Sequence, residues 1–107
     1  MSTIEKSSGN VYADLGVADA EEMYVKAQLA TKIMEIIKAR KLTQAHASKI
    51  LGLSQSKLSN MLNGQFRGIS ESKMLDCLTK LGRNVEIVIS PARRSVTVGH
   101  VAVRFAA

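Results

Sequence analysis

Short amide and hydroxyl side chains gather on one side of residues 55–63. On a helical wheel at about 100° per residue, Leu58, Met61 and Leu62 fall on the opposite side. An amide of this size can donate and accept at once at the edge of adenine in a major groove, and a serine hydroxyl can bond to several bases. We therefore expect the polar side to read double-stranded DNA. It comprises Gln55, Ser56, Ser59, Asn60 and Asn63, with Lys57 on a flank.

The charge distribution around this stretch indicates a polyanionic partner. The net charge is +6 at pH 7, and no acidic residue lies between Glu35 and Glu71. Ordinary solvent exposure would explain any one of the polar side chains. The whole set within an acid-free run favours nucleic acid, because solvated surfaces usually mix both signs of charge. The candidate phosphate contacts are Lys41, Lys49, Lys57 and Arg67, of which Lys49 is the weakest.

Helices of regular apolar spacing are predicted on both sides of residues 55–63. Asp19 with Glu22 forms a capping-box pattern, which starts a helix that runs to about Ala39. The apolar stripe of this helix is predicted to comprise Met23, Ala27, Ala30, Met34 and Ile37. It is widened by Leu29, Ile33 and Ile36.

The next elements are short. Thr43 is the expected N-cap of a helix that ends at Gly52, and Ser54 is that of a second helix that ends at Gly64. Two short helices joined by a glycine-containing turn have the layout of a helix-turn-helix. A further helix is predicted over residues 71–81.

The pattern changes to a period of two after this helix. Val85, Ile87 and Ile89 alternate with other residues, which predicts a strand over 85–90. An isolated strand cannot satisfy its own backbone. We therefore expect it to pair with the same strand of a second subunit, which makes these three residues dimerisation contacts. Residues 91–107 fit either a hairpin around Gly99 or a loose C-terminal arm, and no role is assigned to them.

Several short segments resemble the lambda-repressor-like (Cro/repressor, or XRE) DNA-binding family. The matching segments are Leu42-Thr43-Gln44, Ala47, Ile50-Leu51-Gly52-Leu53-Ser54-Gln55-Ser56, Leu58-Ser59-Asn60 and Leu62-Asn63-Gly64. The resemblance implies a mainly α helical bundle with a helix-turn-helix. A dimer of this family geometry presents its reading helices to half-sites about 34–36 Å apart, which implies a palindromic operator.

The same resemblance implies roles for individual residues. Gln44 would contact phosphate and buttress Gln55, and Asn63 would lie near the DNA backbone. Thr43 and the helix N-terminus after it would present N–H groups to a phosphate. The base-facing residues would be Gln55, Ser56, Ser59 and Asn60.

A narrower resemblance, over roughly residues 9–90, is to HigA-type antitoxins. It is carried by Arg67-Gly68-Ile69-Ser70 and by residues 78–87, Leu-Thr-Lys-Leu-Gly-Arg-Asn-Val-Glu-Ile. It implies a protein that neutralises a ribonuclease toxin of the RelE/HigB kind and represses its own operon. The alternative is a stand-alone XRE-type regulator without a toxin partner.

Composition argues against other classes of function. A single cysteine, Cys77, excludes an internal disulfide and a cysteine-rich metal site, and neither His46 nor His100 has a carboxylate at helical spacing. We expect no catalytic residues, metal or cofactor. The aromatic content of 4% argues against stacking on single-stranded RNA.

No apolar run is long enough to cross a membrane and no secretory signal is visible, so the chain is expected to be cytoplasmic. The expected organisation is a flexible tail over 1–10, a DNA-binding domain with its dimerisation strand over 11–90, and an arm or hairpin over 91–107.

Overall fold

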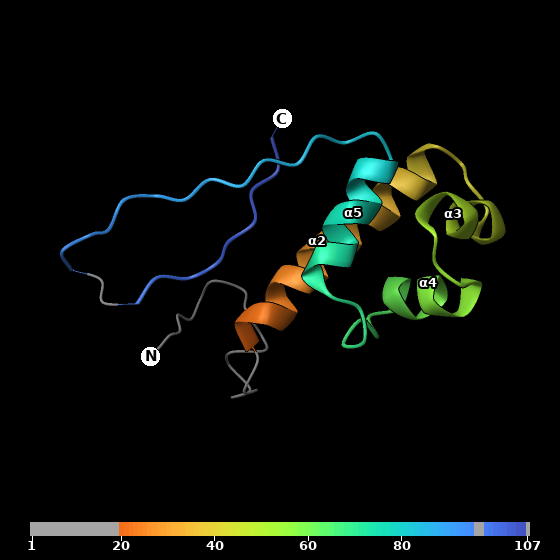
Figure 1. The fold of residues 1–107 in the computed structure, drawn as a ribbon. Coiled ribbons are helices and arrows are strands. Elements are labelled where there is room, and N and C mark those ends of the chain that lie inside the picture. Colours follow the sequence, from red (N-terminus) through yellow and green to blue (C-terminus); the bar gives the residue numbers. More distant parts are fainter. Residues whose placement is uncertain (1–19, 96–97, 107) are drawn as a thin grey trace.

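The computed structural model describes residues 20–95 and 98–106. Within them, four helices form a bundle, from which an extended C-terminal segment departs (Figure 1). The predicted tail over 1–10, the segment 11–19 and the predicted cap Asp19 lie outside the described residues. The helices are α2 (Ala20–Ala39), α3 (Gln44–Leu51), α4 (Gln55–Leu62) and α5 (Glu71–Lys80).

The three short helices begin at hydroxyl caps. The Thr43 hydroxyl accepts from the His46 amide at 3.1 Å. The Ser54 hydroxyl accepts from the Lys57 amide at 3.0 Å, and the Ser70 hydroxyl accepts from that of Lys73 at 3.1 Å. Each cap satisfies one of the backbone donors that a helix start leaves unpaired. The predicted starts of α3 and α4 are therefore confirmed.

A left-handed glycine makes the turn between α3 and α4. Gly52 has a φ of 70° and a ψ of 32°, a conformation that costs a residue with a Cβ about 1–2 kcal/mol. The amide of the following residue, Leu53, donates to the Ser48 carbonyl at 3.0 Å. The chain thus reverses within a few residues and brings α4 against the bundle.

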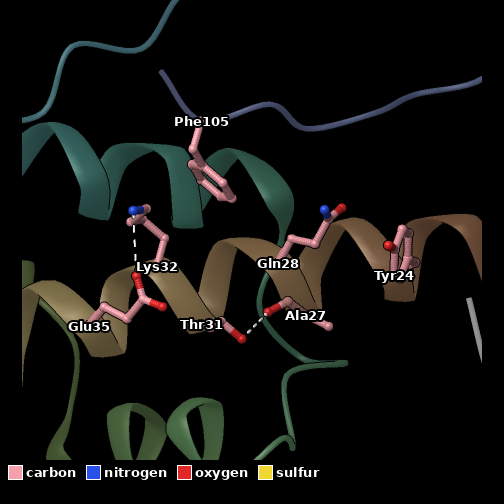
Figure 2. A pocket seen from close by; sticks show the side chains of 7 residues that line it. All are labelled: Tyr24, Ala27, Gln28, Thr31, Lys32, Glu35 and Phe105. Atoms are coloured by element: carbon pink, nitrogen blue, oxygen red, sulfur yellow. Dashed lines mark hydrogen bonds and ion pairs between the residues drawn. The ribbon is translucent and has the colours of Figure 1, made fainter. Parts of the chain in front are cut away.

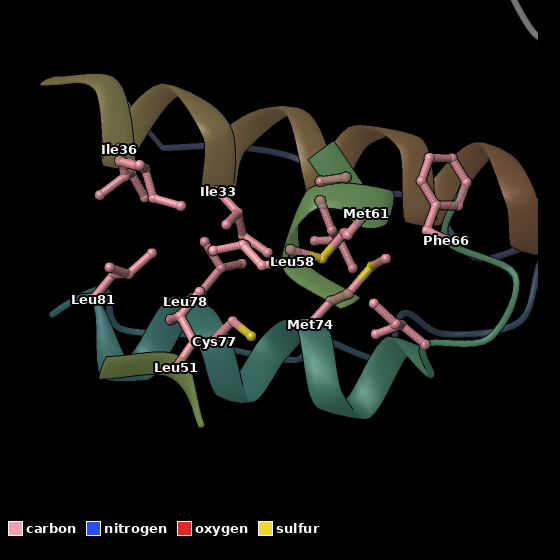
Figure 3. Packing of buried hydrophobic residues seen from close by; sticks show 14 of the residues in the cluster. Ile33, Ile36, Leu51, Leu58, Met61, Phe66, Met74, Cys77, Leu78 and Leu81 are labelled. Atoms are coloured by element: carbon pink, nitrogen blue, oxygen red, sulfur yellow. The ribbon is translucent and has the colours of Figure 1, made fainter. Parts of the chain in front are cut away.

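One apolar core joins all four helices (Figure 3). Helix α2 is its spine, and its most extensive helix contact is with α5. On α4, Leu58 and Met61 are completely buried and Leu62 is half-buried. The largest side chains that are essentially inaccessible to solvent are Ile33, Leu51, Leu58, Met61, Met74 and Cys77.

The buried face of α2 differs from the predicted stripe. Ala27 and Met34 are only half-buried, and Val25, which was not predicted to face the core, is buried. Leu29, Ile33 and Ile36 are buried as predicted, and the wide apolar face lets α2 pack against both α4 and α5. The other predicted members, Met23, Ala30 and Ile37, are buried.

The described residues contain no strand. Residues 85–90, predicted to be one, are extended but pair with nothing, because the described part of a single chain offers no neighbouring strand edge. Nor does a hairpin ladder form among residues 98–106, so the described part of the tail is a loose arm. Within the described residues, no helix is both long and apolar enough to cross a bilayer.

The turn at Gly52 provides a test of the fold. The Gly52→Ala substitution should lower the free energy of unfolding by about 1 kcal/mol, because alanine resists a left-handed φ. A clash would not be the cause, since the added Cβ would lie 3.5 Å from the Lys80 Nζ and 3.8 Å from the Lys73 Nζ. Urea unfolding followed by far-UV circular dichroism measures the change.

Gly68→Ala is the matched control. Gly68 has no positive φ and no neighbour within 4 Å of an added Cβ, so alanine there should be neutral or slightly stabilising. Equal losses at the two positions would show that the conformation of Gly52 is not what matters.

Candidate nucleic-acid interface

Helix α4 presents its polar side to solvent because its apolar side is locked in the core. Leu58 and Met61 have exposures of 0%, which fixes the rotation of the helix. Asn60 is exposed as a result, whereas Ser59 is half-buried at the edge of the exposed face. The predicted site residues that are exposed are Thr43, Gln44, Gln55, Ser56, Lys57, Asn60, Asn63 and Arg67.

The N-termini of α3 and α4 carry the two glutamines of the motif. Gln44 and Gln55 each follow a capping residue and both are exposed. The hydrogen bonds of the described residues include none between them, although the family resemblance implies a buttressing contact. Both helix starts leave backbone N–H groups that favour an anion nearby.

Positive charge on α3 and α4 is not compensated by carboxylates. Lys49 and Lys57 form no ion pair within the described part of the chain. Lysines on α2 and α5 do pair with carboxylates of their own helices: Lys26 with Glu22, Lys32 with Glu35, and Lys73 and Lys80 with Asp76. The electrostatic potential on the side of α3 and α4 is therefore more positive than on the side of α2 and α5.

The pairing on α5 is visible in the titration of its carboxylate. A hydrogen bond from Lys80, supported by Lys73, lowers the pKa of Asp76 below its ordinary value. Asp76 is ionised at neutral pH and offsets the two lysines, which maintains the contrast in charge between α5 and α4.

A shallow depression lies beside the start of α4. Lys57 and Lys73 line it, together with the caps Ser54 and Ser70. In each of the two helices the lysine amide donates to the serine cap three residues before it. Lys73 was missed by the sequence analysis because it follows Glu71, where the acid-free run ends. The repeated pattern Ser-x-Ser-Lys, at 54–57 and 70–73, could have pointed to it.

Lys26, a buried residue of α2, contacts the loop that follows α4. Its side chain has an exposure of 4% and its Nζ lies 3.3 Å from the Glu22 carboxylate. The same Nζ donates to the Arg67 carbonyl oxygen at 3.2 Å. Because Arg67 lies in the loop after α4, this ammonium fastens that loop to α2. The sequence analysis assigned Glu22 to a capping box instead and overlooked Lys26.

The cysteine and the histidine considered for catalysis differ in their surroundings. Cys77 is buried, as expected of a core thiol, and burial raises its pKa. His46 is exposed on α3. The described residues hold no cluster of three side chains suited to a metal ion.

Comparison with known proteins agrees with this geometry. A family model described as a helix-turn-helix domain matches residues 11–90. A solved structure of a putative XRE family transcriptional regulator is similar, with 35% sequence identity and a TM-score of 0.74. This chain is a helix-turn-helix protein of the XRE family. The structural similarity covers 82% of this chain and 99% of the chain of the solved regulator. No match is found among curated proteins.

The role of Lys26 can be tested by hydrogen exchange. The Lys26→Met substitution keeps most of the buried volume but removes the bond to the Arg67 carbonyl. Amides of residues 66–69 should then exchange about fivefold faster, since one such bond contributes about 1 kcal/mol to holding the loop. Lys38→Met, on the exposed end of the same helix, is the control and should leave exchange unchanged. Unaltered exchange in Lys26→Met would contradict the role of Lys26 in holding the loop.

Proposed function

We propose that this protein is a transcriptional regulator that reads double-stranded DNA through α4. The observation that carries the proposal is the exposed, carboxylate-free polar face of α4, held outward by the complete burial of Leu58 and Met61. Membership of the XRE family supports it. The proposal places the protein in the cytoplasm, together with the DNA that it binds.

The contacts divide into two kinds. Gln55, Ser56 and Asn60 point away from the bundle and read base edges, with Ser59 at the margin. Phosphates are held by Lys57 and by the capped helix starts, which fix the position of the protein without reading sequence. The remaining backbone contacts are Thr43, Gln44, Asn63 and Arg67.

Duplex DNA suits this surface better than single-stranded RNA. Readers of single strands stack bases on exposed aromatic rings. In the described part of the chain, Phe66 is buried. Tyr24 belongs to α2 and Phe105 lies beside that helix, away from the polar face of α4. A rigid polar helix matches the width of a major groove.

Two copies of the protein bind one operator in this proposal. A two-fold dimer places its reading helices in successive major grooves, about 34–36 Å apart, on an approximately palindromic site. The dimerisation residues Val85, Ile87 and Ile89 have exposures of 38%, 75% and 90%, which leaves them accessible to a partner.

Base reading and charge can be separated by two substitutions. Asn60→Ala should lose about 1–3 kcal/mol of sequence preference per half-site, because one bidentate base contact disappears, while non-specific affinity is kept. Lys57→Ala should weaken binding to all sequences alike and reduce the slope of log affinity against log salt by about one. Titrations of specific and random duplexes at several salt concentrations measure both.

The two variants serve as controls for each other. Both side chains are exposed, so neither change should alter folding. Identical behaviour on specific and random duplexes would contradict the division of contacts. Unchanged binding in both variants would move the DNA-reading surface away from α4.

The finer proposal is that the protein is the antitoxin of a HigBA-type module, neutralises a RelE/HigB-like ribonuclease and represses its own operon. It rests on the resemblance of residues 67–70 and 78–87 to HigA-type proteins. If it holds, expressing the small basic protein encoded next to this gene should arrest growth, and co-expressing this protein should relieve the arrest. An adjacent product without toxicity would favour the alternative, a stand-alone regulator.

A further inference from the structure

The C-terminal arm, residues 83–95 and 98–106, carries the large exposed apolar side chains of the described part of the chain. It leaves the end of α5, runs away from the bundle and returns towards α2 (Figure 1). We call residues 83–95 the outgoing limb and residues 98–106 the return limb. All the large hydrophobic side chains that are exposed in the described residues belong to the arm: Val85, Ile87, Val88, Ile89, Val98, Val101 and Phe105.

Most of the outgoing limb leaves its backbone groups without a backbone partner. Within the described residues, the backbone–backbone hydrogen bonds end at the Arg83 amide, which donates to the Leu78 carbonyl. Beyond it, β-branched residues follow one another in extended conformation without a ladder. Such an edge is a template for another strand, because each amide and carbonyl can pair with a neighbour.

The exposed apolar side chains of the arm are typical of a protein interface. Their residues reach exposures of 90% at Ile89 and 81% at Val98. Soluble monomers rarely expose large contiguous apolar patches, and such patches commonly mark sites of protein–protein contact. The arm is therefore suited to burial against a partner.

The return limb is held in place by α2. The Val101 amide donates to the Glu21 carboxylate, and Val103 packs against the core. The Phe105 ring lies beside the outer face of α2, with the Lys32 Nζ 4.9 Å from its centroid (Figure 2). The outgoing limb is fixed at its other end by the Arg83 amide. Both ends of the arm thus rest on the bundle, and its apolar middle projects from it.

We propose that the arm is the interface for a second copy of this chain, and that both of its limbs take part. Identical extended limbs can pair antiparallel about a two-fold axis, which makes the contact the same for both subunits. The two-fold dimer of the proposed function is thereby extended to residues 98–106, which lie beyond the family match at residues 11–90. The inference rests on the proposed function only for the link between dimer and operator.

Charge substitutions in the two limbs test the proposal. Ile89→Lys and Val98→Lys should each weaken self-association at least tenfold, because a lysine replaces an apolar contact in the middle of the interface. Ala92→Lys adds the same charge to an exposed position of the arm without removing a large apolar side chain, and should remain dimeric. Sedimentation equilibrium over a range of concentrations measures association.

Folding is controlled within the same experiment. Ile89 and Val98 are exposed in the single chain, so circular dichroism and the Tm of the diluted variants should match the wild type. A wild-type protein that stays monomeric at high micromolar concentration would overturn the proposal. A Val98→Lys variant that associates as tightly as the wild type would overturn the role of the return limb.

A duplex with one half-site separates this inference from the DNA proposal. Monomeric Ile89→Lys should bind that duplex as the wild type does and lose the extra affinity for the full palindrome. Failure of the dimeric wild type to bind any duplex would overturn the regulator proposal and leave the dimer standing. Full palindrome affinity in a monomeric variant would overturn the link between the arm and the operator.

Discussion

The burial of Leu58 and Met61 against α2 is the contact on which the reading surface depends. Helix α4 has eight residues, and isolated helices shorter than about 12–15 residues are marginal in water. Its conformation and its rotation therefore come from packing rather than from intrinsic propensity. The same contact that completes the core also decides which side chains look outward. Stability and recognition are thus two results of one packing arrangement.

Local chemistry made most of the bundle predictable. Thr43 and Ser54 cap their helices, and Gly52 takes the left-handed turn, because each depends on neighbours within a few residues. The rotation of α4 followed from the spacing of its apolar residues. Ser59 shows the limit of a helical wheel. The wheel gives the direction of a side chain from the helix axis but not how far neighbouring side chains cover it. Ser59, at the edge of the polar face, was therefore grouped with the exposed residues although it is half-buried.

Features that depend on distant partners were not predictable. Lys26 bonds to a carbonyl 41 residues away, and nothing near it in sequence signals that bond. The burial of Val25 and the partial exposure of Met34 on α2 depend on where α4 and α5 pack against it. The segment 85–90 has the alternation of a strand, yet a strand exists only when an edge is available. A sequence pattern indicates which structure a segment can adopt, and contacts with neighbouring segments determine whether that structure forms.

The attachment of the arm at two points has a mechanical consequence. One limb continues from α5 and the other rests on α2, so a tilt between these helices would displace one limb relative to the other. Their contact is the most extensive between helices of the bundle, which makes the pair a stiff base. The core therefore fixes the two points from which the arm projects, so core packing would also influence the angle between any two bodies that the arm joins.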